Sequence, residues 1–135
     1  MKKDIPFDPV ENVYLVVAQD KAEGDEEGIW RVYIINKHEE PLDTVMITSK
    51  GYGEKDGLEQ KTSTLRHVIE RLEGNSYAII EPIDESVFHL NNEYWVSYYL
   101  NGQIYDKKFR FVPDSLTDEN VRHIPELDLN GVLHS

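Results

Sequence analysis

Residues 93–112, which read EYWVSYYLNGQIYDKKFRFV, decide the fold of this chain. Asn-Gly stands at their centre, and it is the commonest pair in a two-residue hairpin turn. Aromatic and apolar residues alternate with polar ones on both sides of it. With the turn placed there, Tyr94 lies opposite Phe109 and Trp95 opposite Lys108. The stretch therefore predicts a β-hairpin with Tyr94 and Phe109 facing inward and Trp95 facing outward.

The rest of the chain also consists of short strand-like segments between turn residues. Residues rich in β-branched and aromatic side chains predict strands at 12–19, 29–37, 43–50 and 76–83. About seven strands at such spacing predict an all-β fold, a β-sandwich. The segment 12–19 is apolar on both faces, so it is either covered on both or a short edge piece.

Residues 61–74 are compatible with two structures. Apolar residues recur at helical spacing between Leu65 and Leu72, and Gly74 follows where a helix would end. The alternative is a strand through 62–70 and a Gly-Asn turn into the next strand. Because a helix would need an uncovered sheet face to pack on, the β-rich context favours the strand.

One domain is predicted over residues 1–135. We divide it into an N-terminal extension at 1–11, the sandwich at 12–112, and a C-terminal helical turn and tail at 113–135. The length fits a single domain, since domains of roughly 100–200 residues are the rule.

Two short helical turns are expected. Asp84 caps the first, and Ser115 or Thr117 caps a second that runs through His123. The tail after Pro125 keeps four apolar residues, so we expect it to pack on the domain or on a neighbouring subunit.

The charge of the chain disfavours some classes of partner, and its N-terminal residues and hydropathy indicate its location. Lys and Arg number 14 against 26 Asp and Glu, which gives a formal charge of −12. Such a field repels phosphates, so we expect no nucleic-acid partner and no membrane partner. Acidic residues and prolines interrupt any signal peptide at the N-terminus, and no run approaches the roughly 20 apolar residues of a membrane helix. A cytoplasmic location is therefore expected.

Motifs that would indicate catalysis or a cofactor are missing. The chain has no Cys, which excludes disulfides, thiolate metal sites and cysteine nucleophiles. The acid-rich residues 20–28 lack the ligand spacing of a calcium loop, and we expect a solvated loop there. The glycine-rich residues 51–57 match no phosphate-binding motif, and we expect a surface loop. The five histidines lack metal-ligand spacing, so no catalytic residue, metal or cofactor is predicted.

Outward-facing aromatic residues give the leading hypothesis. Trp95 and Tyr99 share the outer side of the hairpin, and Tyr52 is a further candidate. Interfaces favour Trp and Tyr, which predicts a non-catalytic protein-interaction or accessory module of unknown partner. A second layer, such as the C-terminal tail, could equally cover Trp95 and Tyr99.

Two other hypotheses remain open. One is a small-ligand-binding protein or an enzyme, with a pocket near the loop 51–57 formed by Lys50, Tyr52, Lys61 and His67. The other is a homodimer built through edge strands or through the apolar tail.

Several stretches resemble known families. One set, within about 12–112, comprises 30–36, 40–48, 65–76, 94–98 and 108–111. These paired strands and the last hairpin are similar to those of immunoglobulin-like domains, which implies that architecture without its disulfide. A second set comprises 1–7, 49–53, 62–67, 88–96 and 131–135. It resembles a family of short uncharacterised bacterial proteins, some of which carry a phenylalanyl-tRNA synthetase label. That resemblance implies a cytosolic accessory protein, and the label an alternative role beside a tRNA synthetase, although a charge of −12 disfavours tRNA binding.

Overall fold

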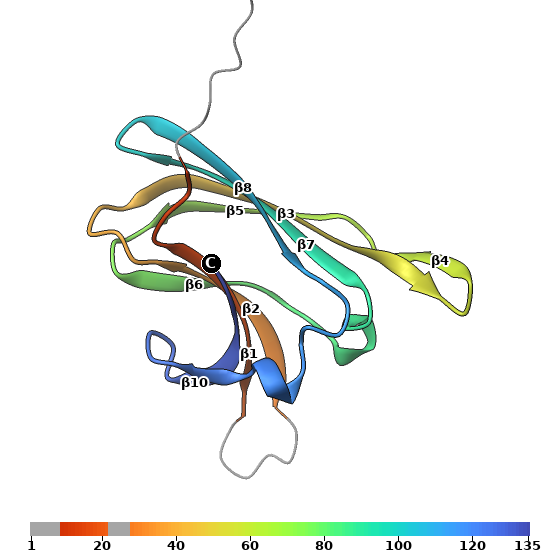
Figure 1. Cartoon of the computed structure of the whole chain (residues 1–135). Helices are drawn as coiled ribbons and strands as arrows, with labels where there is room; N and C mark the ends of the chain where they lie inside the picture. The colour runs from red at the N-terminus through yellow and green to blue at the C-terminus, as the bar shows by residue number, and fades with distance from the viewer. Residues whose placement is uncertain (1–8, 22–27) are drawn as a thin grey trace, which may run out of the picture.

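A computed structural model describes residues 9–21 and 28–135 of the chain (Figure 1). Most of the predicted extension at 1–11, and most of the acid-rich loop predicted at 20–28, lie outside the described residues. The described residues contain no helix with the length and apolar character needed to cross a membrane.

The described residues fold into two antiparallel five-strand sheets, and the prediction of an all-β fold is confirmed. The sheets hold ten strands where about seven were expected. Sheet A has the order β6-β2-β1-β10-β9, and sheet B the order β4-β3-β7-β8, with β5 also paired to β3. Sheet A comprises β1 (Val13–Asp20), β2 (Ile29–Asn36), β6 (Ser76–Pro82), β9 (Arg122–Ile124) and β10 (Leu129–His134). Sheet B comprises β3 (Leu42–Lys55), β4 (Leu58–Lys61), β5 (Leu65–Leu72), β7 (Asn91–Leu100) and β8 (Gln103–Phe111).

The β7–β8 hairpin has the predicted register. Tyr94 pairs with Phe109, and Trp95 with Lys108. Tyr94 and Phe109 are buried in the core between the sheets, whereas Trp95 is exposed. Lys107 is inward but half-buried, and its Nζ reaches the carbonyl oxygen of Ser135 at 2.8 Å. Two-residue periodicity therefore predicts correctly which side chains of this hairpin face inward, including Lys107, a charged residue on the inward face.

The glycine-rich stretch 51–57 is not the surface loop that we predicted. Residues 51–55 continue β3, and a tight turn at Asp56-Gly57 leads into β4. Asp56 and Gly57 both have positive φ, 53° and 77°, as the two-residue hairpin turn requires. The Asp-Gly signal was present in the sequence, but the neighbouring glycines obscured it. The β3–β4 hairpin projects beyond the body of the sandwich (Figure 1).

Within residues 61–74, Leu65–Leu72 form strand β5, so a strand rather than a helix is confirmed, although it begins at 65 and not at 62 as expected. Leu65–Leu72 pairs with β3, and the turn at Gly74-Asn75 follows as expected. The β5–β6 connection crosses from sheet B to sheet A, as the β2–β3 connection crosses in the opposite direction.

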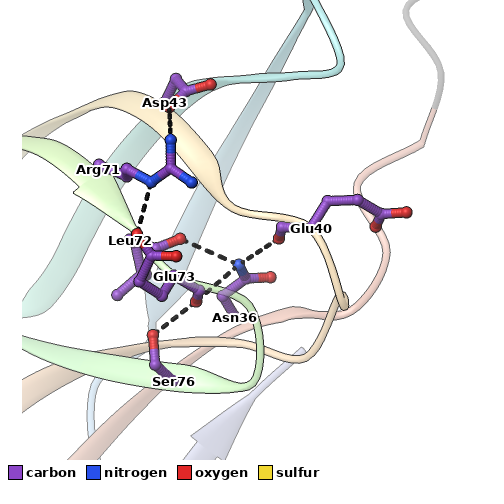
Figure 2. Close-up of polar contacts among 7 residues, drawn as sticks. All are labelled: Asn36, Glu40, Asp43, Arg71, Leu72, Glu73 and Ser76. Carbon is purple, nitrogen blue, oxygen red and sulfur yellow. Dashed lines mark hydrogen bonds and ion pairs between the residues drawn. The ribbon is translucent and has the colours of Figure 1, made fainter.

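A buried amide joins these two crossing connections (Figure 2). Asn36 is fully buried at the end of β2, and its Nδ2 donates to the carbonyl oxygens of Glu40 (3.0 Å), Leu72 (3.3 Å) and Glu73 (3.1 Å). Its Oδ1 accepts from the amide of His38 at 2.9 Å. A single side chain therefore satisfies backbone groups of both connections and fixes one end of the sandwich.

The sandwich extends past its predicted boundary at residue 112. Strand β10 lies between β1 and β9 in sheet A, with Val132 opposite Val17. The tail therefore packs on its own domain, the first of the two placements that we expected. Its pairing depends on a strand more than a hundred residues away, which no local pattern reveals.

The two predicted helical turns are 3-10 turns. The first, Glu85–Val87, is capped by Asp84, whose carboxylate accepts from the Ser86 amide at 2.8 Å, as predicted. The second spans only Asp118–Asn120, and Thr117 makes no side-chain capping bond. The predicted continuation through His123 is wrong, because that residue lies in β9 and pairs with β10.

The outer side of β1 and β2 in sheet A is covered by C-terminal residues. Val16 and Ala18 of β1 are fully buried there. Ile124 and Leu127 pack over them in a second core cluster. This confirms that both faces of β1 are covered, and it explains why β1 is apolar throughout.

Candidate functional site

The outer face of sheet B, in contrast, carries exposed apolar side chains. We call it the open face and define it by the outward side chains of residues 43–50, 65–72, 91–100 and 103–111. No element within 9–21 and 28–135 packs over it, so the C-terminal tail does not provide the second layer that we considered. The exposed apolar residues of the open face are Met46 (42%), Val68 (64%), Trp95 (45%), Tyr99 (40%) and Ile104 (39%).

Strand register brings these residues together. Met46 pairs with Val68 on one side and with Ser97 on the other, between Trp95 and Tyr99. Tyr99 pairs with Ile104. Direct cross-strand neighbours on one face lie about 4.5–5.5 Å apart at Cβ, and diagonal ones about 7–8 Å, which aromatic side chains can span. Met46–Val68 and Tyr99–Ile104 are direct pairs, and Trp95 is a diagonal neighbour of Met46.

Trp95 is held in place by its polar neighbours. The Nζ of Lys108 lies over its ring, 4.7 Å from the ring centroid, and its Nε1 donates to Asp106. The same carboxylate accepts from the Ser97 hydroxyl at 3.4 Å. The indole is thus oriented before any partner binds, which lowers the entropic cost of contact.

The open face differs in charge from the rest of the molecule. It holds five cationic residues and four acidic ones, a net of 5 − 4 = +1, in a chain of net charge −12. The remainder therefore carries −12 − 1 = −13. The cationic residues are Lys50, Arg66, Arg71, Lys108 and Arg110, and the acidic ones Asp43, Glu70, Glu93 and Asp106.

Most of these cations have a carboxylate nearby. Lys50 Nζ is 3.6 Å from a carboxylate oxygen of Glu93, and Arg71 lies 4.0 Å from one of Asp43. A hydrogen bond with Tyr52, and the charge of Glu93, raise the pKa of Arg110. Arg66 and Lys108 pair with no carboxylate among the described residues, and they flank the strand positions of Thr48 and Trp95.

The structure places the predicted interface residues on one side of sheet B. Trp95 and Tyr99 lie on the open face. Tyr52 lies further along β3, opposite Asn91, and its hydroxyl donates to Glu93 at 3.4 Å. It is separated from Trp95 by the polar row that contains Glu93, so it borders the apolar patch rather than belonging to it.

The predicted pocket residues do not converge. Lys50 and Tyr52 project from the outer side of β3, and Lys61 pairs with Tyr52 from β4. His67 pairs with Ile47, a buried core residue, and so faces the space between the sheets. Strand alternation therefore places His67 on the opposite side of sheet B from Lys50.

His67 instead belongs to a polar cluster that the sequence did not suggest. A carboxylate oxygen of Glu81 lies 2.7 Å from both the Ser49 hydroxyl and the His67 Nε2. Its other oxygen accepts from the Tyr94 hydroxyl at 3.2 Å. We call Ser49, His67, Glu81 and Tyr94 the Glu81 cluster. It joins β6 of sheet A to three strands of sheet B.

A register shift explains why Glu81 points inward. Val32 pairs with Glu81, but Tyr33 pairs with Ile79, so Ile80 is an extra residue in β6. A bulge of this kind turns the following side chain to the other face of the strand. Alternation alone would have placed Glu81 in solvent, which is why this cluster could not be predicted from the pattern of residues.

The Glu81 cluster is not a catalytic triad. Ser49 is only 3% exposed and donates to the carboxylate rather than to the imidazole, so it is not available as a nucleophile. Burial, and then the charge of Glu81, raise the pKa of Tyr94, so its hydroxyl stays protonated and donates. The residues that the structure describes contain no group of three or more His, Asp or Glu side chains that could hold a metal.

A cleft of about 190 Å³ opens beside this cluster. Its walls come from both sheets and from the 3-10 turn after β6. They include Lys50, Thr62, Ser63, Glu81, Asn92 and Tyr94. A larger depression of about 690 Å³ is lined by residues that include Gln19, Gly28, Trp30 and Glu85, and we assign no site to it.

Comparison with protein-family models, with curated proteins and with solved structures finds no match to this chain. The two resemblances noted in the sequence therefore stay predictions, and function must be argued from the geometry of the chain itself.

Proposed function

We propose that this chain is a non-catalytic protein-interaction module that binds its partner through the open face. The observation that carries the proposal is the exposure of Trp95, at 45%, beside the exposed apolar residues Met46 and Val68 on a face that no described element covers. Trp, Tyr, Met and Arg are enriched at protein interfaces, and all four occur on this face. Apolar patches of this kind on a monomer indicate interaction surfaces.

Charge supports a partner that differs from this chain. Two copies, each at −12, repel one another over most of their surfaces. The open face, at +1, is the part that an acidic or neutral protein approaches with least repulsion. Electrostatic complementarity of this kind favours specificity and the rate of association more than affinity.

We also propose that the sandwich is immunoglobulin-like. Its support is the strand order, in which β6-β2-β1 form one sheet and β5-β3-β7-β8 the other. This arrangement matches the E-B-A and C′-C-F-G strands of such domains. Strands β9 and β10 extend sheet A beyond that pattern. In this fold the outer side of the C-F-G sheet corresponds to the open face.

Affinity capture from the cell that expresses the protein, with matched variants, tests the proposed interaction. The test variant is Trp95→Ala with Tyr99→Ala. The control is Tyr77→Ala with Ile79→Ala, which removes an aromatic and an aliphatic residue of similar exposure from β6 of sheet A. Binding of each purified variant to the captured protein is then measured by calorimetry.

We expect the test variant to lose at least about 2 kcal/mol of binding free energy, since central aromatic residues carry most of the energy of an interface. The control variant should bind as the unmodified chain does. Equal binding by all three proteins contradicts the proposed function.

A second candidate, small-molecule binding in the cleft beside Glu81, is favoured by one observation. The cleft combines a half-buried carboxylate with the hydroxyls of Thr62 and Ser63, a small number of polar groups in a concave site. A fragment screen by protein NMR tests it. Shift changes that concentrate on Thr62, Ser63 and Asn92 support it, and a screen without such hits removes it.

A further inference from the structure

A row of four side chains crosses the open face at right angles to its strands. Arg66 of β5 pairs with Thr48 of β3, Thr48 with Trp95 of β7, and Trp95 with Lys108 of β8. An indole thus stands between two cations. Neither cation pairs with a carboxylate among the described residues, although acidic residues outnumber basic ones 26 to 14 in the chain.

The lack of ion pairs distinguishes this row from the next one. In the next row, Lys50 and Arg110 flank Glu93, which lies 3.6 Å from the Lys50 ammonium. Asp106, the acid closest to Trp95, accepts from the indole and from Ser97. The Lys108 ammonium lies over the Trp95 ring and beside no carboxylate of the described residues. The charges of Arg66 and Lys108 are therefore not neutralised by an ion pair, and both remain available to an acidic partner.

The spacing of the row matches an extended peptide. Neighbouring strands lie about 4.8 Å apart, so the backbone positions of Arg66 and Lys108, three strand spacings apart, are about 14 Å from each other. The Lys108 side chain leans over Trp95, so it must turn outward to reach a carboxylate at that spacing. An extended chain rises about 3.4 Å per residue, so residues i and i+4 are also about 14 Å apart and point to the same side. Residue i+2 then lies over the middle of the row.

From this match, we infer that the partner presents an extended segment with two acidic residues four positions apart and an apolar residue midway between them. The inference rests on the proposed function. The two carboxylates pair with Arg66 and Lys108, and the apolar side chain packs beside Trp95. Met46 and Val68 lie in the adjacent row and extend the apolar contact. Arginine is suited to one end, because its guanidinium binds a carboxylate through two parallel hydrogen bonds.

A direct test uses a synthetic peptide as the probe. The peptide Gly-Glu-Ser-Phe-Ser-Glu-Gly is titrated to millimolar concentration into the full chain, and the indole N–H resonances are followed by NMR. Trp30 provides an internal control, because its Nε1 donates to Glu85 at 2.8 Å, away from sheet B. We expect the Trp95 resonance to shift and that of Trp30 to stay unchanged.

Two control probes separate charge from general stickiness. A peptide with Lys in place of both Glu residues should bind at least about ten-fold more weakly, because it reverses both ion pairs. An oligothymidylate should not shift the Trp95 resonance. Equal binding of the acidic and basic peptides, a comparable effect of the oligothymidylate, or no shift with the acidic peptide overturns the inference.

Charge-reversal variants locate the contact and separate this inference from the proposed function. Arg66→Glu and Lys108→Glu should each weaken the acidic peptide by about three- to ten-fold, since an exposed pair is replaced by a repulsion. Arg122→Glu, an exposed site on β9 of sheet A, should change nothing. If Trp95→Ala abolishes binding of the captured partner but neither charge reversal weakens it, the acidic segment is wrong and the interaction surface stands. If Trp95→Ala with Tyr99→Ala leaves partner binding intact, the proposed function fails.

Discussion

Sheet A and sheet B both carry apolar side chains on their outer faces, but the described residues cover β1 and β2 of sheet A and no part of the outer face of sheet B. On β6, at the edge of sheet A, Tyr77 and Ile79 also stay exposed. On sheet A, Val16 and Tyr33 are almost completely buried under Ile124 and Leu127. On sheet B, Trp95 remains 45% exposed, and no described element lies above it. The same residue types therefore have two roles, one in the second core and one on the surface.

This contrast shows how exposed apolar residues are to be interpreted. Of the residues after β8, Ile124, Leu127 and Leu129 pack on the outer side of sheet A, and none of those described packs on the open face. Each Å² of apolar surface removed from water stabilises the fold by about 25 cal/mol. The exposed apolar residues of the open face do not contribute this stabilisation. The difference is consistent with a surface kept for association, and four predictions test it.

Removing the cover of sheet A should have the largest effect. Ile124 is 2% exposed and packs on the outer side of β1. Ile124→Ala should lower the free energy of unfolding by about 2–5 kcal/mol, because it leaves a cavity in the second core. Urea denaturation followed by circular dichroism measures this. A loss below about 1 kcal/mol would mean that residues 121–129 contribute little to stability.

Adding a side chain at the contact between β10 and β1 should lower the free energy of unfolding somewhat less. A Cβ added at Gly131 of β10 would lie 2.6 Å from the Val17 carbonyl oxygen and 2.8 Å from the Ala18 Cβ. Gly131→Ala should therefore cost about 1–3 kcal/mol by forcing β10 away from β1. For comparison we use Ala78→Gly in β6. Gly57→Ala on the β3–β4 hairpin is unsuitable, because the positive φ of Gly57 would itself strain an alanine there. Unchanged stability in Gly131→Ala would contradict the close packing of β10 on β1.

The matching change on the open face should barely affect folding. Trp95→Ala removes the contact with Lys108 and the bond to Asp106, both at the surface. Exposed interactions of this kind are worth about 1 kcal/mol or less. The same denaturation assay should therefore show a loss far smaller than that of Ile124→Ala. A loss as large would make Trp95 a core residue and remove the contrast between the faces.

The smallest effect on stability is expected for a surface ion pair between the C-terminal residues and β2. Glu126 lies 2.9 Å from the Lys37 ammonium at the end of β2, and this hydrogen-bonded partner lowers the pKa of Glu126 below its ordinary 4.5. The pair therefore stabilises the fold above that ordinary value and stops doing so as the pH falls through the lowered pKa. Glu126→Gln should be slightly less stable than the unmodified chain at pH 7 and equal to it at pH 2, as thermal unfolding at both values would show. An equal loss at both pH values would point to packing rather than charge.

Local patterns predicted the parts of the fold that depend on neighbours in sequence. Asn101-Gly102 fixed the register of β7 and β8, and with it the outward direction of Trp95 and Tyr99. The cap at Asp84 and the strand character of residues 65–72 followed from the same kind of reasoning. The open face was therefore within reach of the sequence, except for Met46, Val68 and Ile104, whose exposure depends on what covers each sheet.

The parts that were missed depend on distant contacts or on a single extra residue. Strand β10 needs β1 as its partner, and strand β9 needs β10. The bulge at Ile80 turns Glu81 inward. A bulge cannot be predicted from the alternation of polar and apolar residues. His67 was accordingly assigned to a surface pocket, although it faces the core side of sheet B.

The bonding of Asn36 has a consequence for hydrogen exchange. Its side-chain N–H groups are buried and donate to carbonyls of two connections that cross between the sheets (Figure 2). They cannot reach solvent until those connections separate, so their exchange with deuterium requires opening of that end of the molecule. The rate at which the side-chain NH₂ signal of Asn36 disappears in heavy water therefore reports how often this end of the sandwich opens, without any probe attached to the chain.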